Sequence, residues 1–256
     1  MNETIRLLNA RKSVRVFEDR EIPAEIREAI LNAAMRAPTA GNMMLYSILD
    51  ITDQAVKDKL AVTCDDQPFI ASAKMVLIFC ADYHRWYRKF KLAGCDAGDV
   101  PPPQLSDLIL ATNDAVIAAH AACTAAESFG VGSCYIGDIL ENCEQVRELL
   151  DLPLYAMPAV MVVYGHPTDQ QRLREKPPRF DPRFIVQENA YRRLSPEEHR
   201  EMYLERERAM GREHTDYDAS VQAFYRRKYE AAFSREMSRS VQAYLEGFYP
   251  DDDGRF

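Results

Sequence analysis

Met75-Val76-Leu77-Ile78-Phe79-Cys80-Ala81 is a continuous apolar run with β-branched and aromatic members. Strands that are covered on both faces have this composition, because neither face of such a strand meets water. A second run of the same kind extends from Ala156 to Tyr164. We predict that both runs are strands of one buried sheet and that the first lies at its centre.

Shorter strand patterns and amphipathic helices surround these two runs. Residues 46–51 and 131–136 have strand character, and residues 24–36 repeat apolar side chains on one helical face. Residues 104–129 predict a helix about 39 Å long, whose alanines permit the close approach of a neighbouring helix. Strands that alternate with helices indicate an α/β or α+β protein with a layered core.

The last third of the chain shows no strand pattern. Regular periodicity disappears between Gly165 and Gln187, where Pro and Arg accumulate, and this composition predicts an extended loop. Two heavily charged helices are expected after it, over residues 196–210 and 217–248. The second of these carries more aromatic residues than a free helix needs, which either a dimer partner or packing onto its own subunit explains.

Composition limits the class of protein. The chain has 256 residues, of which 47% are hydrophobic, which suffices for one main domain with an appended helical segment. Its net charge of -8 argues against binding to nucleic acid or to an anionic membrane. Six scattered cysteines without a Cys-x-x-Cys pair are typical of reduced thiols, so we expect a cytoplasmic protein. No secretion signal is recognised at the N-terminus, and residues 105–131 carry too many polar groups for a bilayer.

Two groups of cations stand out in this acidic chain. Arg11-Lys12-Ser13-Val14-Arg15-Val16-Phe17 connects two expected helices, and Lys176-Pro177-Pro178-Arg179 lies in the extended loop. A guanidinium fork, a mobile ammonium and a hydroxyl together suit a phosphate or an electron-rich ring edge. The two loops could converge on one small anionic ligand, although a solvated basic loop explains the first stretch about as well when that stretch is taken alone.

Other site chemistries find little support in the sequence. Gly130-Val131-Gly132-Ser133-Cys134-Tyr135 has tyrosine where a dinucleotide-binding fingerprint needs a small residue. The sequence contains no Gly-x-x-x-x-Gly-Lys-Ser/Thr loop, and its five histidines lack zinc-like spacing, so we predict no metal site. Cys134 is interpreted as a small core residue, although sequence alone does not exclude a cysteine nucleophile.

Four segments in order resemble the signature of the FMN-dependent nitroreductases. They are the stretch 11–17, then Ala37-Pro38-Thr39-Ala40-Gly41-Asn42, then Tyr135-Ile136-Gly137, then Lys176-Pro177-Pro178-Arg179. The resemblance runs from about residue 5 to about residue 192, with weaker similarity beyond. The most similar group is the NADPH-type oxygen-insensitive nitroreductases and flavin reductases.

This resemblance implies an architecture. The expected fold is α+β, with three layers: a central mixed, mainly antiparallel sheet flanked by helices, with a C-terminal helical extension, in a homodimer. Residues 1–192 would form the FMN-binding core, including a cofactor loop at 165–187. Residues 193–256 would form the extension, which packs on the core and on the dimer partner.

The resemblance also implies an FMN site. Arg11, Ser13, Lys176 and Arg179 would meet the phosphate and nearby oxygens, while Lys12 and Arg15 would lie toward the ribityl and pyrimidine side. Gln67 would meet the polar edge of the ring, and Tyr135, Ile136 and Gly137 would present backbone groups to it. The turn formed by Pro38, Thr39, Ala40 and Asn42 would reach the flavin of the partner subunit.

Two departures from the family pattern affect this site. Met44 stands where the group commonly has glutamine, which puts one polar contact at the edge of the site in doubt. The family's Lys-x-Arg is here Lys-Pro-Pro-Arg with Arg174 close by, so either Arg174 or Arg179 would accompany Lys176.

The implied function is that of an NAD(P)H-dependent oxidoreductase. It would reduce nitroaromatics, quinones or flavins by two-electron, ping-pong hydride transfer through flavin N5, so no catalytic side chain is expected. Alternatives are a dedicated flavin reductase, an azo or dehalogenating reductase on the same fold, or a nucleotide-binding module without redox turnover. Arg206, Arg208 and Arg212 are candidates for an NADPH 2′-phosphate, against the simpler interpretation of a solvated charged helix face.

Overall fold

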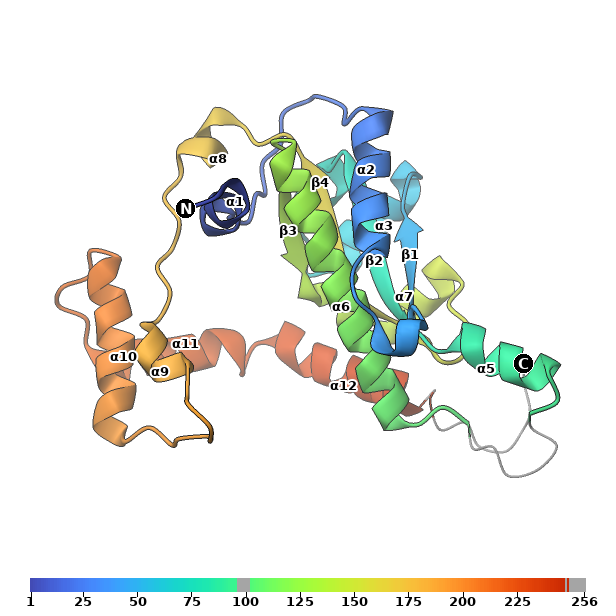
Figure 1. Cartoon of the computed structure of the whole chain (residues 1–256). Helices are drawn as coiled ribbons and strands as arrows, with labels where there is room; N and C mark the ends of the chain where they lie inside the picture. The colour runs from blue at the N-terminus through green and yellow to red at the C-terminus, as the bar shows by residue number, and fades with distance from the viewer. Residues whose placement is uncertain (96–101, 247, 249–256) are drawn as a thin grey trace. The chain divides into compact units, whose positions relative to one another are not determined.

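The computed structural model describes residues 1–95, 102–246 and 248. The chain divides into two compact units (Figure 1). The first consists of Met1–Leu173 and Glu236–Phe256, and the second of Arg174–Arg235. The second unit is thus inserted between two parts of the first, and the boundary predicted at residue 192 falls inside it.

Among the described residues, four strands of the first unit form one sheet. They are β1 (Tyr46–Asp50), β2 (Met75–Asp82), β3 (Gly132–Ile136) and β4 (Ala156–Gly165). Their order is β1-β2-β4-β3, and every neighbouring pair is antiparallel. The two apolar runs are the two central strands, which confirms the prediction for residues 75–81 and 156–164. A parallel element enters only at the edge of the sheet, as an isolated bridge between Ser13 and Ser133.

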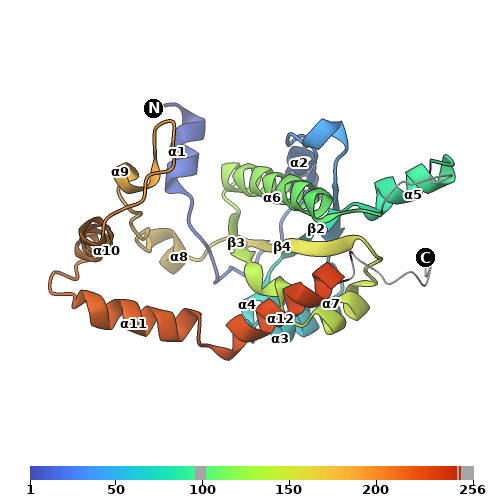
Figure 2. The same ribbon diagram turned by 90° about the horizontal axis from the view of Figure 1, so that it is seen from below.

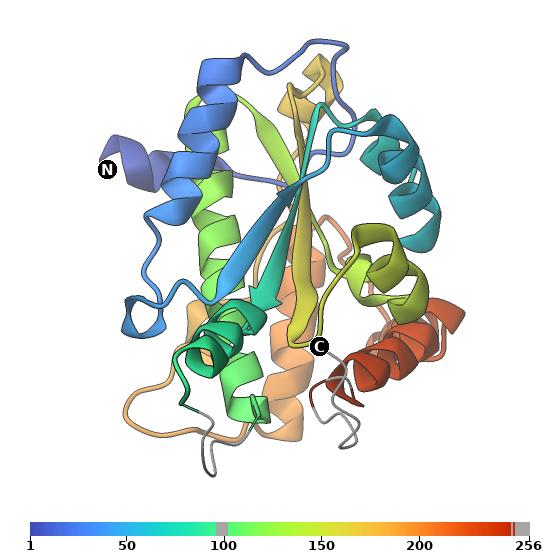
Figure 3. The same cartoon turned by 90° about the vertical axis from the view of Figure 1, so that its right-hand side faces the viewer.

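Helices cover both faces of this sheet, so the unit has three layers (Figure 3). The helices of the first unit are α1 (Glu3–Ala10), α2 (Ala24–Met35), η1 (Ala40–Asn42), α3 (Gln54–Thr63), α4 (Phe69–Ser72), α5 (His84–Leu92), α6 (Leu105–Ser128), η2 (Gly137–Leu140), α7 (Cys143–Leu150) and α8 (Asp169–Leu173). Leu77 and Phe79 of β2 point to the layer of α2 and α6. Val76 and Ile78 point to the layer of α3, α4 and α7. The α+β class expected from the sequence is confirmed.

The long helix α6 passes by length and composition as a possible membrane span, the single such helix in the described part of the chain. One whole face of it, however, lies in the protein core, with Ala115, Ala118 and Ala122 fully buried against the sheet and α2. The same buried face carries Asp114, which binds backbone groups of a neighbouring loop. The helix is therefore the core helix predicted from its alanines.

The second unit contains α9 (Pro182–Ile185), α10 (Pro196–Ala209) and α11 (Tyr217–Lys228). Two predictions were wrong in detail. The segment 165–187 is not a continuous loop, because it includes the short helices α8 and α9. The predicted helix over residues 217–248 is two helices, α11 and α12 (Ala232–Glu246), separated at residues 229–231.

From Glu236 onward, α12 is part of the first unit and lies beside α7 (Figure 2). The Ser240 hydroxyl accepts a hydrogen bond from the Cys143 backbone N–H at 2.8 Å. Tyr244 and Phe248 are buried in a cluster with Tyr155, whose ring meets that of Phe248 edge to face at 5.7 Å. Packing of aromatic residues onto their own subunit thus accounts for this end of the chain. Residues 96–101, 247 and 249–256 lie outside the described part.

Candidate functional site

The basic stretch predicted from the sequence lies along the end of the sheet formed by β3 and β4. The Val14 backbone N–H donates to the Ser133 carbonyl at 2.9 Å, and the Glu18 N–H donates to the His166 carbonyl at 2.8 Å. Residues 13–18 are named the strap below. Backbone hydrogen bonds near both of its ends hold it against the sheet, so the cations beside it have a defined position.

Two glycines make this close approach possible. Gly132 and Gly165 are partners in the register of β3 and β4. A Cβ on Gly132 would lie 2.6 Å from Cγ2 of Val14, and a Cβ on Gly165 would lie 2.6 Å from the ring of Phe17. Because real Cβ atoms do not approach other heavy atoms so closely, the strap can rest on the sheet only where side chains are absent.

Arg11 lies beside β3 on the side of the sheet that α6 covers. Its Nη2 is 3.4 Å from the Ser133 hydroxyl, and its guanidinium carbon is 5.6 Å from the centre of the Tyr135 ring. Its Nε is buried and has no hydrogen-bond partner among the described residues. A buried donor without an acceptor is costly. That Arg11 binds an anionic group stays a prediction.

Lys12 is held through its side chain, whereas Arg15 is held through its backbone. The Lys12 Nζ donates to the carbonyl of Arg172 at 2.7 Å, and the backbone N–H of Arg15 approaches Gln171 Oε1 at 3.4 Å. The Arg15 side chain is exposed. The structure therefore places Arg11, Lys12 and Ser13 at the edge of β3, and it places the Arg15 side chain beside the Cys134 thiol.

The side chains at the end of β3 pack inside the protein. Ile136 is buried in the layer of α3 and α7, and Tyr135 packs against the layer of α6. Gly137 is exposed, and a Cβ on it would meet nothing within 4 Å. The backbone at Gly137 is therefore open to a flat ligand, as expected for residues that offer main-chain groups.

Gln67 lies beside this open backbone. Its Nε2 donates to the Cys64 carbonyl and to Asp138 Oδ2, both at 2.7 Å. Both amide hydrogens are thereby used, which leaves Oε1 as the group that Gln67 can offer to a ligand. The structure thus brings Gln67 next to Gly137 and Asp138, which are 70 residues or more away along the chain.

The turn at residues 38–42 is fixed by groups that the sequence analysis did not identify. Asp114 of α6 is 3% exposed and accepts from the Ala40 N–H at 2.9 Å and from the Leu45 N–H at 3.1 Å. The Trp86 indole donates to the Met43 carbonyl at 2.7 Å. The signal for Asp114 was present in the sequence, because it shares a helical face with the buried alanines at positions 111, 115 and 118.

Met44 itself is half-buried and packs against the apolar layer of α2 and α6. Its backbone has φ = 52°, and its carbonyl accepts from Arg85 at 3.1 Å. Thr39 accepts from the Met44 N–H through its hydroxyl at 3.2 Å. The turn is therefore anchored to α5 and α6, whereas the strap is anchored to β3 and β4. The role of the turn at the cofactor of the partner subunit stays a prediction.

Lys176 and Arg179 belong to the second unit. Arg179 lines a cavity of about 520 Å³ in that unit, together with Arg206, Arg212 and Arg227. Glu207, which is 2% exposed, also lines this cavity and accepts from Arg212 at 2.8 Å. The convergence of Lys176 and Arg179 with the strap stays a prediction.

The three arginines proposed for a 2′-phosphate do not share one site. Arg206 stacks on Phe180 at 4.3 Å and has a buried Nε without a partner in the described part of the chain. Arg208 lines a different cavity, beside His199 and Asp218. Arg206 and Arg212 thus form an arginine-lined cavity with Arg179, and Arg208 is part of an exposed helix face.

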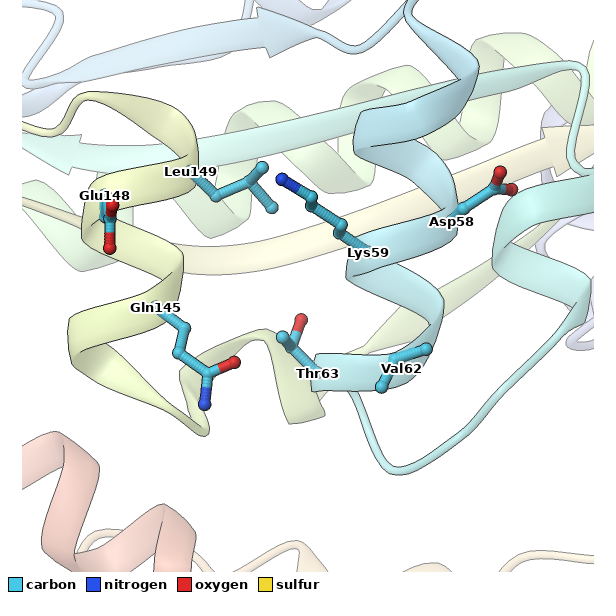
Figure 4. A pocket seen from close by; sticks show the side chains of 7 residues that line it. All are labelled: Asp58, Lys59, Val62, Thr63, Gln145, Glu148 and Leu149. Atoms are coloured by element: carbon cyan, nitrogen blue, oxygen red, sulfur yellow. The ribbon is translucent and has the colours of Figure 1, made fainter.

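A further cavity of about 740 Å³ lies between α3 and α7 (Figure 4). Its lining is mixed in charge, with Asp58 and Lys59 from α3 and Glu148 from α7, and it shares no residue with the predicted site. Among the described residues, no group of three or more His, Cys, Asp or Glu side chains is placed to hold a metal ion.

Comparison with known proteins gives consistent matches. The sequence profile of the Nitroreductase family matches residues 8–166. The chain is 36% identical over 197 residues to the "Oxygen-insensitive NADPH nitroreductase" of Salmonella typhimurium, which covers 76% of this chain and 77% of that protein. It is 29% identical over 252 residues to the "FMN reductase [NAD(P)H]" of Bacillus subtilis, covering 97% of this chain and 93% of the relative.

Solved structures agree in fold. The NADPH:FMN oxidoreductase from Vibrio harveyi complexed with NAD+ superimposes with a TM-score of 0.72 at 28% identity, covering 96% of this chain and 98% of that one. The similarity therefore spans the first unit, the inserted second unit and the return of the chain to the first.

Proposed function

This chain belongs to the Nitroreductase family, and from that premise we propose that it is an FMN-dependent oxidoreductase that uses NAD(P)H to reduce nitroaromatics, quinones or flavins. The family match covers more than half of the chain. Its relatives include one named as an NADPH nitroreductase and one named as an FMN reductase. The two names agree on a nicotinamide-driven reduction and differ in the acceptor.

One observation in the site carries the assignment of FMN. The Arg11 Nε is a buried donor that lacks a partner in the described part of the chain, beside a Ser13–Ser133 pair of hydroxyl residues. A phosphate oxygen would satisfy that donor and would be favoured by the positive charge of the guanidinium. The open backbone at Gly137 offers room for the ring. These features fit a ligand with an anionic tail and a flat head.

The two-electron chemistry is supplied by FMN when it is bound. The contribution of the chain is binding and orientation. Arg11 and Ser13 would hold the phosphate with Lys176 and Arg179, while Lys12 and Arg15 would place positive charge toward the ribityl and pyrimidine side. Gln67 Oε1 would accept a hydrogen bond from the ring edge, because both of its amide hydrogens are engaged. Cations near the ring favour its reduced, more negative form.

The arginine-lined cavity of the second unit is assigned to the nicotinamide co-substrate. Arg206 and Arg212 would meet the 2′-phosphate of NADPH, since the cavity combines several guanidinium groups with one buried carboxylate. Glu207 lies 2.8 Å from Arg212 and 3.6 Å from Arg206, so it partly neutralises both. Arg206 is the stronger candidate because its buried Nε has no partner among the described residues. A preference for NADPH over NADH follows from this assignment.

A homodimer in the cytoplasm is the proposed state of the protein. The exposed face of α6 carries five large apolar side chains, each at least 40% exposed: Leu105, Ile109, Leu110, Val116 and Ile117. A helix face of this kind is costly in water and is typical of a covered interface. A second copy would cover it and would bring its own turn at residues 38–42 to the site.

The decisive experiment is the visible spectrum of the purified protein. Bound oxidised FMN would give a yellow protein whose absorbance bleaches when NADPH is added without oxygen. A colourless, dialysed sample that takes up no added FMN would overturn the proposal. Equilibrium ultracentrifugation of the same sample tests the dimer.

A dedicated flavin reductase is the second candidate, because the match to the FMN reductase of Bacillus subtilis spans 97% of this chain. Steady-state rates with a nitrofuran, a quinone and free FMN distinguish the two. A rate with free FMN that exceeds the others by orders of magnitude would assign the flavin reductase function.

A further inference from the structure

Glu141 is a buried carboxyl group directly after η2, close to the open backbone at Gly137. Its side chain is 4% exposed, and Oε1 is buried with no hydrogen-bond partner among the residues that the structure describes. Charged carboxylates are rarely left in this state, because a buried anion without a donor is strongly destabilised. A proton on Glu141 would remove that cost.

The charged groups that face Glu141 come from three elements, and they are acidic. They are Asp138 of η2, Asp65 of the turn after α3 and Glu236 of α12. Glu236 accepts from the Asn142 N–H at 3.2 Å and binds Arg239, which is also bound to Glu144. Burial, with these neighbouring negative charges, raises the pKa of Glu141 to about 7.

This acidic group is connected to the predicted cofactor site. Asp138 accepts from Gln67 Nε2 at 2.7 Å, and Asp138 follows Gly137 directly in the chain. Gln67 and Gly137 are the residues that would meet the polar edge of the ring and its N5 side. Asp138 therefore connects Glu141 to two residues that are proposed to face the ring.

We propose that Glu141 and Asp138 form a proton-holding pair that takes up one proton when the bound cofactor is reduced and releases it when the acceptor is reduced. The inference rests on the proposed function. Hydride from NAD(P)H adds two electrons and one hydrogen to the cofactor, which leaves one extra negative charge. The extra proton comes from water and binds a carboxylate oxygen of the pair. The acceptor then takes the hydride, the cofactor loses its extra charge, and the proton leaves with the reduced acceptor.

The physical reason is mutual electrostatics. A negative charge that develops near a carboxyl group raises its pKa, so reduction of the cofactor moves the pKa of Glu141 upward. The Glu141 side chain is hydrogen-bonded to Asp138, which helps to hold a proton on Glu141. Glu141 acts through Asp138 and Gln67, and is therefore a positioning residue.

The test is the midpoint potential of the FMN-loaded protein, measured by spectroelectrochemistry between pH 5.5 and 9. Each proton taken up with two electrons changes the equilibrium tenfold per pH unit, which is about 30 mV. We expect one proton per two electrons below about pH 7, and two just above it, so that the slope doubles. In Glu141→Gln the slope should stay at the one-proton value throughout.

Two further variants make the result specific. Glu144→Gln removes a nearby carboxylate that is 65% exposed and bound to Arg239, so it should keep the bend of the wild-type protein. Asp138→Asn removes one negative neighbour and should move the bend to lower pH. This second variant decides the question if Glu141→Gln does not fold.

The titration of Glu141 can also be followed directly by carboxyl carbon NMR. A midpoint near pH 7 in the oxidised protein that moves upward on reduction supports the proposal, and a midpoint near 4.5 overturns it. A wild-type slope that equals that of Glu141→Gln, with FMN bound to both, overturns the proton-holding pair alone. Failure of the protein to bind FMN overturns the pair and the proposed function together.

Discussion

Gly132 and Gly165 face each other across β3 and β4, and each lies beneath an apolar side chain of the strap. Val14 covers the first and Phe17 covers the second. Since Arg11 and Lys12 directly precede the strap, the position of these cations, which are predicted to bind FMN, depends on the absence of side chains at the two glycines. Hydrogen bonds from Val14 and Glu18 to the strand ends complete the arrangement.

Gly132→Ala is therefore expected to displace the strap. The new Cβ would need the space of the Val14 side chain, and overpacking of this kind costs about 1–3 kcal/mol. We expect weaker FMN binding, measured by fluorescence titration, and a lower denaturant midpoint. The double variant Gly132→Ala with Val14→Ala restores space and should recover part of the FMN affinity. Equal affinity in wild type and Gly132→Ala would contradict the role of the strap.

Arg11→Ala should weaken FMN binding without unfolding the protein. One hydrogen bond to a charged group is worth about 1.5–3 kcal/mol, which corresponds to roughly a 10- to 150-fold higher Kd. Fluorescence titration of the FMN-free protein measures this Kd. Arg6→Ala, which removes an exposed cation paired with Glu3 on α1, is the matched control and should leave the Kd unchanged.

Asp114→Ala should destabilise the first unit even without a cofactor. The carboxylate accepts from two backbone N–H groups, of Ala40 and Leu45, and both would lose a charged acceptor. We expect the free energy of unfolding to fall by about 3 kcal/mol or more, as measured by urea denaturation. Glu28→Ala, which removes an exposed carboxylate of α2, should change it by less than about 0.5 kcal/mol.

The pH dependence of stability gives an independent check on Glu141. Its pKa is about 7 in the folded protein, against an ordinary value of 4.5 for glutamate, so the folded state binds the proton more tightly than the unfolded chain does. This contribution to stability is fully present below about pH 4.5 and is lost as the pH rises through 7. Glu141→Gln should therefore gain stability relative to wild type between pH 5 and pH 8, in urea melts at each pH.

Glu144→Gln serves as the control with the opposite sign. Arg239 lowers the pKa of Glu144 to about 2, so its contribution is present above about pH 4.5 and is lost only as the pH falls toward 2. Between pH 5 and pH 8 its stability difference from wild type should stay constant. A parallel trend in the two variants would show that Glu141 does not titrate as described.

Arg206→Ala should raise KM for NADPH and leave KM for NADH nearly unchanged. The reason is that the guanidinium would meet a phosphate that NADH lacks, and one such contact is worth about 1.5–3 kcal/mol. Steady-state kinetics with both nucleotides measures the effect. Arg208→Ala, on the same helix but lining a different cavity, is the control. Equal changes with NADPH and NADH would exclude a phosphate contact.

Local composition predicted much of the fold. Residues 75–81 are apolar at every position because both faces of β2 are covered. The break between α11 and α12 was missed because Tyr229-Glu230-Ala231 contains neither Gly nor Pro. In that case tertiary packing, which a local pattern does not contain, ends the helix.

The site was harder to predict in detail than the fold. The resemblance grouped Arg11, Ser13 and Gln67 by role, and the structure brings Ser13 to Ser133 and Gln67 to Asp138. These contacts join segments that are far apart in the sequence, so no local pattern could predict them. Gly132 and Gly165 carry no local signal for the strap, and Asp114 resembles a solvated acid until its helical face is considered. No pattern in the sequence predicts that Glu141 is buried, because its neighbours Asp65 and Glu236 come from distant segments.

The inserted position of the second unit has an evolutionary consequence. The chain leaves the sheet-containing unit at Leu173 and re-enters it at Glu236, where Tyr244 then packs beside Tyr155. A segment with two fixed attachment points can be exchanged between homologues as a cassette. Recombination at these two junctions would exchange the arginine-lined cavity together with Lys176 and Arg179, and would leave the sheet and the strap unchanged.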